Sequence, residues 1–240
     1  MVKKIINRVT VTGADDSIQP KELIQIAKEY PFVEFGILLS KQQQGNKRFP
    51  SRNWLNELYI EWRNNKKLAL SGHLCGAWVR NLCVGMPNFF QEFGCTWKMF
   101  DRFQLNFHAE PHVASEGFSE VLREYMGSRQ IIFQMDGVNE KIFSAIENRW
   151  GIYAYPLFDT SGGVGVLPKA WPKQYTYCGY AGGLSPDNLQ QELEKIAQVA
   201  DGPIWIDAET HLRSQDDMLF DQVKVRRFLE VAKPWVIDQK

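Results

Sequence analysis

Eight short apolar or alternating runs divide the chain, and longer segments with helical periodicity lie between them. The runs that predict strands cover residues 8–12, 32–39, 68–72, 102–107, 130–134, 153–158, 176–181 and 203–207. The segments that predict helices cover residues 20–29, 53–62, 76–83, 115–125, 139–148, 186–199 and 220–231. Eight such units, without a Gly-x-Gly-x-x-Gly sequence after the first strand, predict an α/β fold of the closed (β/α)8 TIM barrel type. The alternative is an open doubly wound sheet.

Two connections depart from this rhythm. Residues 40–50 after the second strand form a polar loop, long enough to predict a mobile cover over the barrel mouth. The segment from the sixth strand to Lys173 holds three glycines and two prolines, so its helix is expected to be short or absent.

Length and composition favour a single domain over residues 1–240, because such barrels commonly have about 250 residues. Twenty-eight basic residues balance 28 acidic ones, which gives no indication of nucleic acid or a membrane surface as a partner. Four scattered cysteines, with no secretory leader and no apolar run of membrane-spanning length, predict a soluble cytoplasmic protein with reduced thiols. A small molecule is the expected partner.

Polar residues follow the ends of the predicted strands, where a parallel barrel builds its active site. The candidates are Thr12, Arg48, His73, His108, Glu110, His112, Asp136, Asp159, Asp207 and Glu209. Three of the four histidines belong to this set, which favours a functional role for this end of the barrel.

The stretch from residue 152 to 189 contains two of the strand-like runs, and glycines follow each run. Ser185 after the pair Gly182-Gly183 has the character of a helix N-cap, with Pro186 at the first helical position. Glycines before a helix start let the backbone approach a ligand, and the helix N-terminus favours an anion such as phosphate. The alternative is a tight turn that requires positive φ angles.

These residues resemble the phosphoribosylanthranilate isomerases, a family of (β/α)8 barrels. The similar segments are FDTSGGVG at residues 158–165, AGGLSPDN at 181–188, WID at 205–207 and DQVKVRRFL at 221–229. The resemblance implies an isomerase-type enzyme without a cofactor that acts on a phosphorylated sugar. It further implies that Asp159 is a general acid and that the phosphate-binding residues are Gly162, Gly163, Gly182, Gly183 and Ser185.

Three positions depart from the family pattern. Thr12 stands where the family has its catalytic cysteine, and a threonine hydroxyl lacks the acidity that lets a thiol act as a base. Arg48 matches the family's substrate-binding arginine only across an insertion, and Glu209 replaces small residues next to the phosphate. We therefore expect acid–base chemistry on a related metabolite rather than the family's own reaction.

Two further hypotheses remain open. His108, Glu110 and His112 alternate along an extended segment and, with His73 or Asp136, have the ligand types for a divalent metal. This set would suit a metal-dependent lyase, epimerase or hydrolase. The chain could also be a non-catalytic relative that binds an anion at the glycine turn. The main hypothesis requires no metal.

Overall fold

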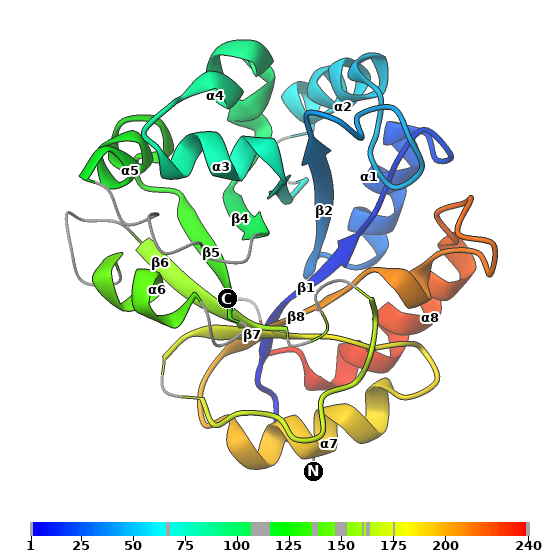
Figure 1. The fold of residues 1–240 in the computed structure, drawn as a ribbon. Helices are drawn as coiled ribbons and strands as arrows, with labels where there is room; N and C mark the ends of the chain where they lie inside the picture. Colours follow the sequence, from blue (N-terminus) through cyan, green and yellow to red (C-terminus); the bar gives the residue numbers. More distant parts are fainter. Residues whose placement is uncertain are drawn as a thin grey trace.

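Eight parallel strands form a closed barrel in the computed structural model, which describes residues 2–65, 68–106, 116–135, 139–146, 153–159, 161, 164–174 and 176–238. Each strand pairs with the next one in sequence, and β8 pairs with β1 (Figure 1). The strands are β1 Ile6–Thr12, β2 Val33–Ser40, β3 Leu70–Cys75, β4 Arg102–Asn106, β5 Gln130–Met135, β6 Tyr153–Phe158, β7 Cys178–Ala181 and β8 Ile204–Ala208. The predicted barrel is confirmed, and the open-sheet alternative is wrong.

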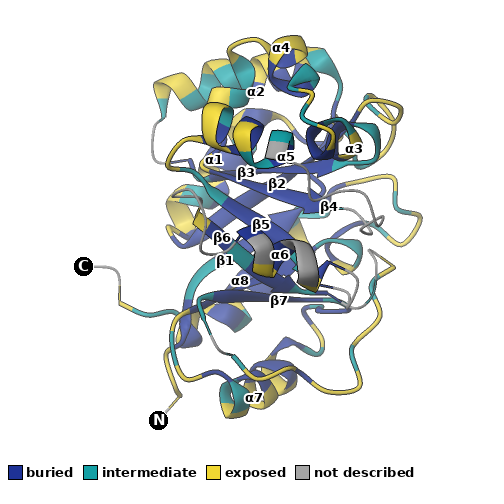
Figure 2. Ribbon diagram, turned by 60° about the vertical axis from the view of Figure 1, so that its left-hand side comes forward, coloured by how far each residue is buried: buried dark blue, intermediate teal, exposed yellow. Residues whose placement is uncertain are grey.

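Helices surround the barrel, with buried faces toward the strands and exposed faces outward (Figure 2). They are α1 Pro20–Glu29, α2 Arg52–Asn64, α3 Ala77–Cys83, α4 Asn88–Phe93, α5 Glu116–Val121, α6 Glu140–Ile146, α7 Leu189–Val199 and α8 Gln222–Ala232. Short 3-10 turns cover Thr96–Met99, Thr210–Leu212 and Lys233–Trp235, and a π-helical turn covers Leu122–Met126. Within the described ranges, no helix is both long and apolar enough to cross a membrane.

Local sequence signals fix several of these elements. All eight residues of β2 are buried, as expected for a parallel strand covered on both faces. The Asp221 side chain accepts hydrogen bonds from the backbone N–H groups of Val223 and Lys224, which caps α8. The Ser51 hydroxyl caps α2 in the same way by accepting from the Trp54 N–H group.

The structure differs most clearly from the predicted elements in two places. Helix α4 and the turn at Thr96–Met99 lie in a segment for which the sequence predicted no element. Helix α7 begins at Leu189 with Asn188 at the N-cap position, so the predicted first helical residue at Pro186 is wrong, although the Ser185 hydroxyl accepts a hydrogen bond from the Asn188 N–H group at 3.3 Å. As predicted, no helix occupies the described part of the segment between β6 and β7.

The inside of the barrel is polar on one side and apolar on the other. Ile132, Leu157, Ala181 and Trp205 form a small buried cluster that belongs to β5 through β8. Polar side chains are buried along β1 through β4: Thr10, Thr12, Glu34, Ser71, His73, Arg102 and Gln104. Bulky branched apolar residues usually fill the interior of such a barrel. The buried polar residues of β1 through β4 differ from this pattern.

Candidate active site

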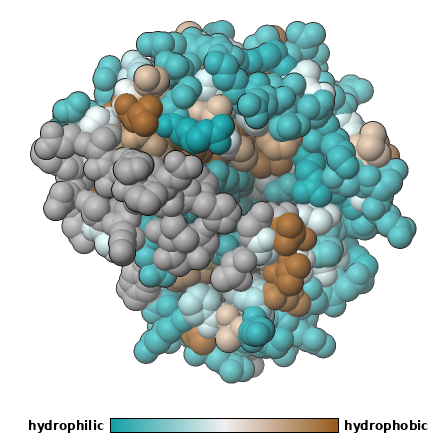
Figure 3. All heavy atoms as spheres, viewed as in Figure 1, coloured by the Kyte–Doolittle hydropathy of each residue, from teal (hydrophilic) through white to brown (hydrophobic). Residues whose placement is uncertain are grey.

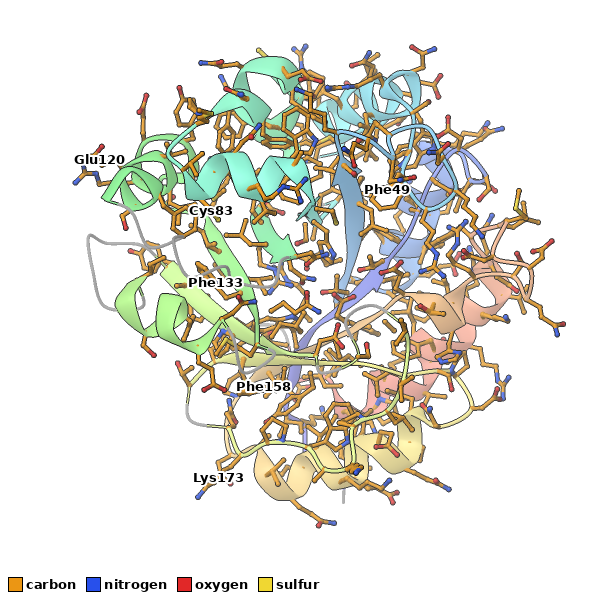
Figure 4. All side chains as sticks on the ribbon, in the orientation of Figure 1. Phe49, Cys83, Glu120, Phe133, Phe158 and Lys173 are labelled. Atoms are coloured by element: carbon orange, nitrogen blue, oxygen red, sulfur yellow. The ribbon has the colours of Figure 1, made fainter. Side chains whose placement is uncertain are left out.

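A cavity of about 300 Å³ opens at the C-terminal ends of the strands. Every strand except β1 contributes a lining residue, and further residues come from the segments after β2, β6, β7 and β8. Figure 4 labels Phe49, which lines the cavity, and Phe158 at the end of β6, on opposite sides of the strand ring in this view. The face in Figure 3 is mostly hydrophilic with small apolar areas, and Val164, Val166 and Leu167 are among the exposed apolar residues.

Asp207 is a buried carboxyl group in the wall of this cavity. It lies on β8 with 6% of its surface exposed, and the Thr12 hydroxyl of β1 donates a hydrogen bond to its Oδ1 at 2.7 Å. Burial, helped by the nearby charges of Glu209, Asp159 and Glu34, raises the pKa of Asp207 to about 8, although the bond from Thr12 opposes this shift. Asp207 is therefore largely protonated at neutral pH and can donate a proton.

Asp159 is a second carboxyl group of the cavity, directly after β6. Its Oδ2 accepts a hydrogen bond from Gln134 Nε2 at 3.0 Å, and its Oδ1 accepts from the Ser161 backbone N–H at 2.9 Å and the Ser161 hydroxyl at 2.6 Å. All three of these groups donate to the carboxyl oxygens of Asp159. The cavity thus combines a carboxyl group whose pKa is raised by burial with a second carboxyl group that accepts hydrogen bonds.

His73 is a neutral imidazole at the cavity floor. Complete burial lowers the pKa of His73 to about 3, although the charge of Glu34 opposes this shift and the charge of Arg102 adds only a smaller lowering. Its position depends on Gly36 of β2, because a Cβ atom there would lie 2.8 Å from His73 Cε1 and 2.2 Å from Thr12 Oγ1. The missing side chain of Gly36 therefore makes room for both groups.

An ion-pair network joins the segments after β2 and β8 at the rim. Arg48 Nη1 donates to Glu209 Oε1 at 2.8 Å, and Arg48 Nε donates to both carboxylate oxygens of Asp217 at 2.8 Å. Asp217 also pairs with Arg213 Nε at 2.9 Å and with Lys47 Nζ at 3.1 Å. We call Lys47, Arg48, Glu209, Arg213 and Asp217 the rim network. Because Arg48 neutralises Glu209, the carboxylate does not present an unpaired charge to the cavity.

The glycine turn after β7 contacts the segment after β6. Gly182 and Gly183 line the cavity with φ angles of 105° and 67°, and a Cβ atom on Gly183 would lie 2.4 Å from the Leu167 backbone nitrogen. The Ser185 backbone N–H donates to Asn188 Oδ1 at 2.8 Å, and Asn188 Nδ2 donates to the Gly183 carbonyl at 2.8 Å. Both glycines are therefore required by packing as well as by conformation.

Eight of the predicted site residues lie together at this end of the barrel. Seven line the cavity, namely Arg48, His73, Asp159, Gly182, Gly183, Asp207 and Glu209, and Thr12 supports Asp207. Ser185 lies in the adjacent turn. The predictions for His108, Glu110, His112, Asp136, Gly162 and Gly163 fall outside the described residues. Within the described part of the chain, no group of three or more His, Cys, Asp or Glu side chains could hold a metal ion.

Gln104 and Asp217 are site residues that the sequence analysis missed. Gln104 is two positions before the end of β4, on the same strand face as Asn106, and this spacing of two is the signal that could have found it. Asp217 lies in the segment between β8 and α8, and nothing in its immediate sequence indicates its three basic partners.

Comparisons with known proteins add evidence on the fold. No protein-family model and no curated protein matches the chain. Among solved structures, N-(5'-phosphoribosyl)anthranilate isomerase from Pyrococcus furiosus matches with a TM-score of 0.55 and 15% identity, over 95% of this chain and 98% of that chain. The barrel, closed by β8 against β1, aligns over almost its whole length. The chain is a TIM barrel.

Two more structures support the TIM-barrel fold. A mutant tryptophan synthase alpha-subunit from Pyrococcus furiosus has a TM-score of 0.57 and 14% identity, over 96% of this chain and 100% of that chain. A truncated 3-deoxy-D-arabino-heptulosonate 7-phosphate synthase from Thermotoga maritima has a TM-score of 0.54 and 13% identity, over 96% and 87%. At these identities the likeness extends to the TIM-barrel fold alone.

Proposed function

We propose that this TIM barrel is a cytoplasmic, isomerase-like enzyme that performs acid–base chemistry on a small phosphorylated sugar or a similar metabolite. The observation that carries the proposal is the pair of carboxyl groups in one cavity, of which Asp207 is buried with a raised pKa and Asp159 accepts hydrogen bonds from Gln134 and Ser161. Environments that separate the protonation states of two carboxyl groups are typical of an acid and a base that work together.

In this proposal Asp207 is the proton donor and Asp159 the proton acceptor. Asp207 gives its proton to a carbonyl or ring oxygen of the substrate, while Asp159 removes a proton from an adjacent carbon. This exchanges the acid role that the family resemblance implies for Asp159. Thr12 orients Asp207 through its 2.7 Å hydrogen bond and has no role as a base.

Residues at the rim of the cavity support the proposal that the substrate carries a phosphate group. Gly182 and Gly183 line the cavity without side chains, so a phosphate group can approach their backbone. The pairing of Glu209 with Arg48 removes the repulsion that a free carboxylate would exert on a phosphate. The names of the similar anthranilate isomerase and heptulosonate phosphate synthase contain phosphorylated compounds, which is compatible with this class of ligand.

Turnover of a panel of ribose-phosphate compounds, followed by proton NMR, tests the proposal. Asp207→Asn keeps the size of the side chain but removes the proton donor, so we expect the turnover number to fall by about 100- to 10,000-fold. Asp201→Asn, on the exposed surface, is the matched control and should retain full activity. Unchanged turnover in Asp207→Asn would contradict the proposed acid role.

The other hypotheses have distinct signatures in the same experiments. Binding of a ribose phosphate without turnover by the unmodified protein would identify a non-catalytic anion-binding relative. Bound metal in the purified protein, with activity that is lost on chelation, would favour the set His108, Glu110, His112 and Asp136.

A further inference from the structure

Two buried polar atoms at the cavity floor have no hydrogen-bond partner among the described residues. They are His73 Nε2 of β3 and Gln104 Oε1 of β4, and their residues are only 1% and 5% exposed. His73 and Gln104 are direct partners in the β3–β4 register, so their side chains are neighbours on the inner face, and both line the cavity. The Gln104 amide is oriented by its Nε2, which donates to Asn106 Oδ1 at 2.9 Å and leaves Oε1 free to accept.

This pair forms a neutral part of the cavity. His73 carries no charge near neutral pH, because the effect of its burial outweighs the opposing charge of Glu34. The charged groups that act on the imidazole are Glu34 and Arg102, which pair with each other below the floor. Leaving a buried donor or acceptor without a partner costs about 1–3 kcal/mol. A ligand group that forms hydrogen bonds with these atoms would recover this cost.

We propose that His73 and Gln104 bind a hydroxyl group of the substrate and distinguish a polyhydroxylated substrate from its deoxy analogue. The inference rests on the proposed function, because it concerns the same cavity. A hydroxyl group can donate its one proton to Gln104 Oε1 and accept a hydrogen bond from the Nε2–H group of His73, so it fits the tautomer protonated at Nε2. An ammonium group could not accept from that N–H group, and a phosphate oxygen facing Gln104 Oε1 would bring two acceptors together.

The geometry also sets the orientation of the substrate. The hydroxylated end lies on the floor beside β3 and β4, and the phosphate lies at the rim beside Gly182 and Gly183. A site that hydrogen-bonds a substrate hydroxyl discriminates strongly against an analogue without it, because the buried protein atoms then remain unpaired. His73 and Gln104 are thus specificity-determining residues, separate in role from Asp159 and Asp207.

Calorimetric titration tests this assignment with D-ribose 5-phosphate, 2-deoxy-D-ribose 5-phosphate and inorganic phosphate as probes. We expect Gln104→Leu to weaken binding of ribose 5-phosphate by at least about tenfold, since a lost hydrogen bond in a buried site leaves its partner unpaired. Binding of inorganic phosphate should not change. Gln91→Leu makes the same chemical change on the exposed face of α4 and should leave all three affinities unaltered. Equal affinities for ribose 5-phosphate in Gln104→Leu and the unmodified protein would overturn the assignment.

A crystal structure of the unmodified, ligand-free protein tests the assignment of His73 and Gln104 independently. We expect an ordered water within hydrogen-bond distance of both His73 Nε2 and Gln104 Oε1, which a substrate hydroxyl would replace. An empty gap, or direct contact between the two side chains, would overturn the proposal. This test does not depend on whether a sugar phosphate binds. If ribose 5-phosphate binds through this pair but is never turned over, the proposed enzyme function fails while the floor assignment stands.

Discussion

At the scale of single residues, burial and the hydrogen bond from Thr12 have opposite effects on the pKa of Asp207, and burial outweighs the hydrogen bond. Its pKa is about 8 in the folded protein against an ordinary value of 3.8. A raised pKa means that the folded state binds the proton more tightly than the unfolded state does. The contribution to stability is therefore complete below pH 3.8 and is lost as the pH rises toward about 8.

Asp207→Asn should remove this pH dependence. We expect the variant to gain thermal stability relative to the unmodified protein at pH 8.5 and to gain less or nothing at pH 5, because the asparagine never has to ionise. Thermal unfolding at the two pH values measures the difference. Asp201→Asn, which is exposed, should show the same small effect at both. A shift in melting temperature that does not depend on pH would contradict the raised pKa.

Gly36→Ala should disturb the site by steric clash, without a change in charge or hydrogen bonding. The added Cβ atom would lie 2.2 Å from Thr12 Oγ1 and 2.8 Å from His73 Cε1, so both side chains must move. We expect a loss of about 1–3 kcal/mol in the free energy of unfolding, as is usual for overpacking. Gly202→Ala, where the new atom meets only ordinary contacts of 3.7 Å or more, is the control. Chemical denaturation of both variants gives the comparison, and equal stabilities would show that the site adapts freely.

Much of the candidate site could be predicted from residue positions. The rule that strand ends form the active site correctly brought Thr12, His73, Asp159 and Asp207 to the same end of the barrel. The pairing of Thr12 with Asp207 could not be predicted, because it joins residues 195 positions apart and depends on the closure of β8 against β1. The raised pKa of Asp207 results from its burial in the closed barrel and could not be predicted from the sequence either.

At the scale of elements, the rim network connects the segment between β2 and α2 to the segment between β8 and α8. Asp217 is the common partner of Lys47, Arg48 and Arg213, and both Arg48 and Asp217 have positive φ angles, of 71° and 61°. Two non-glycine residues in this conformation are held there by their mutual contact. The polar loop that the sequence predicted as a cover is therefore attached to the rim in this structure.

Asp217→Asn should loosen both segments. An amide has no negative charge and one acceptor oxygen instead of two, so it pairs more weakly with three basic side chains. We therefore expect faster amide hydrogen exchange in residues 41–50 and 210–220. The rate in β1 to β8 should change little. Asp238→Asn, which removes an exposed ion pair with Lys4, is the matched control. Unchanged exchange in both segments would mean that other contacts hold the rim.

Element boundaries were predicted unevenly. Strand β6 was predicted with its observed bounds, since its flanking residues are clear turn formers. The segment between α3 and β4 was left without an element, because α4 is only six residues long and its buried face consists of three phenylalanines without a longer helical repeat. The start of α7 was placed three residues early, because a turn at residues 185–188, in which the Ser185 hydroxyl accepts from the Asn188 N–H group, precedes the helix.

At the scale of the whole molecule, the polar side of the barrel interior depends on one buried ion pair. Glu34 is fully buried and accepts hydrogen bonds from Arg102, Arg8 and Thr10. Burial alone would raise the pKa of Glu34, but the two arginines outweigh it and lower the pKa to about 2. The guanidinium of Arg102 also lies 4.8 Å from the centre of the Trp205 ring, which joins the polar and apolar sides of the interior.

Arg102→Met should therefore destabilise the whole barrel. Removing one partner of a buried ion pair leaves an uncompensated charge, at a cost of about 3–5 kcal/mol. Arg8→Met removes the other arginine, whose side chain is 33% exposed, and should cost clearly less. Urea unfolding followed by circular dichroism compares the two variants. A larger loss of unfolding free energy in Arg8→Met than in Arg102→Met would contradict the main role assigned to Arg102.

The polar side of the barrel interior should also affect how the stability of the protein varies with temperature. Unfolding normally raises the heat capacity by about 12–15 cal/mol/K per residue, because hydration of apolar surface raises it while hydration of polar surface lowers it. This chain releases buried carboxyl, guanidinium, imidazole and amide groups together with its apolar core. Its heat-capacity change should fall below that range, as calorimetry can measure. The resulting stability curve is broad and shallow, so cooling the protein should weaken its fold less than in a barrel with an entirely apolar centre.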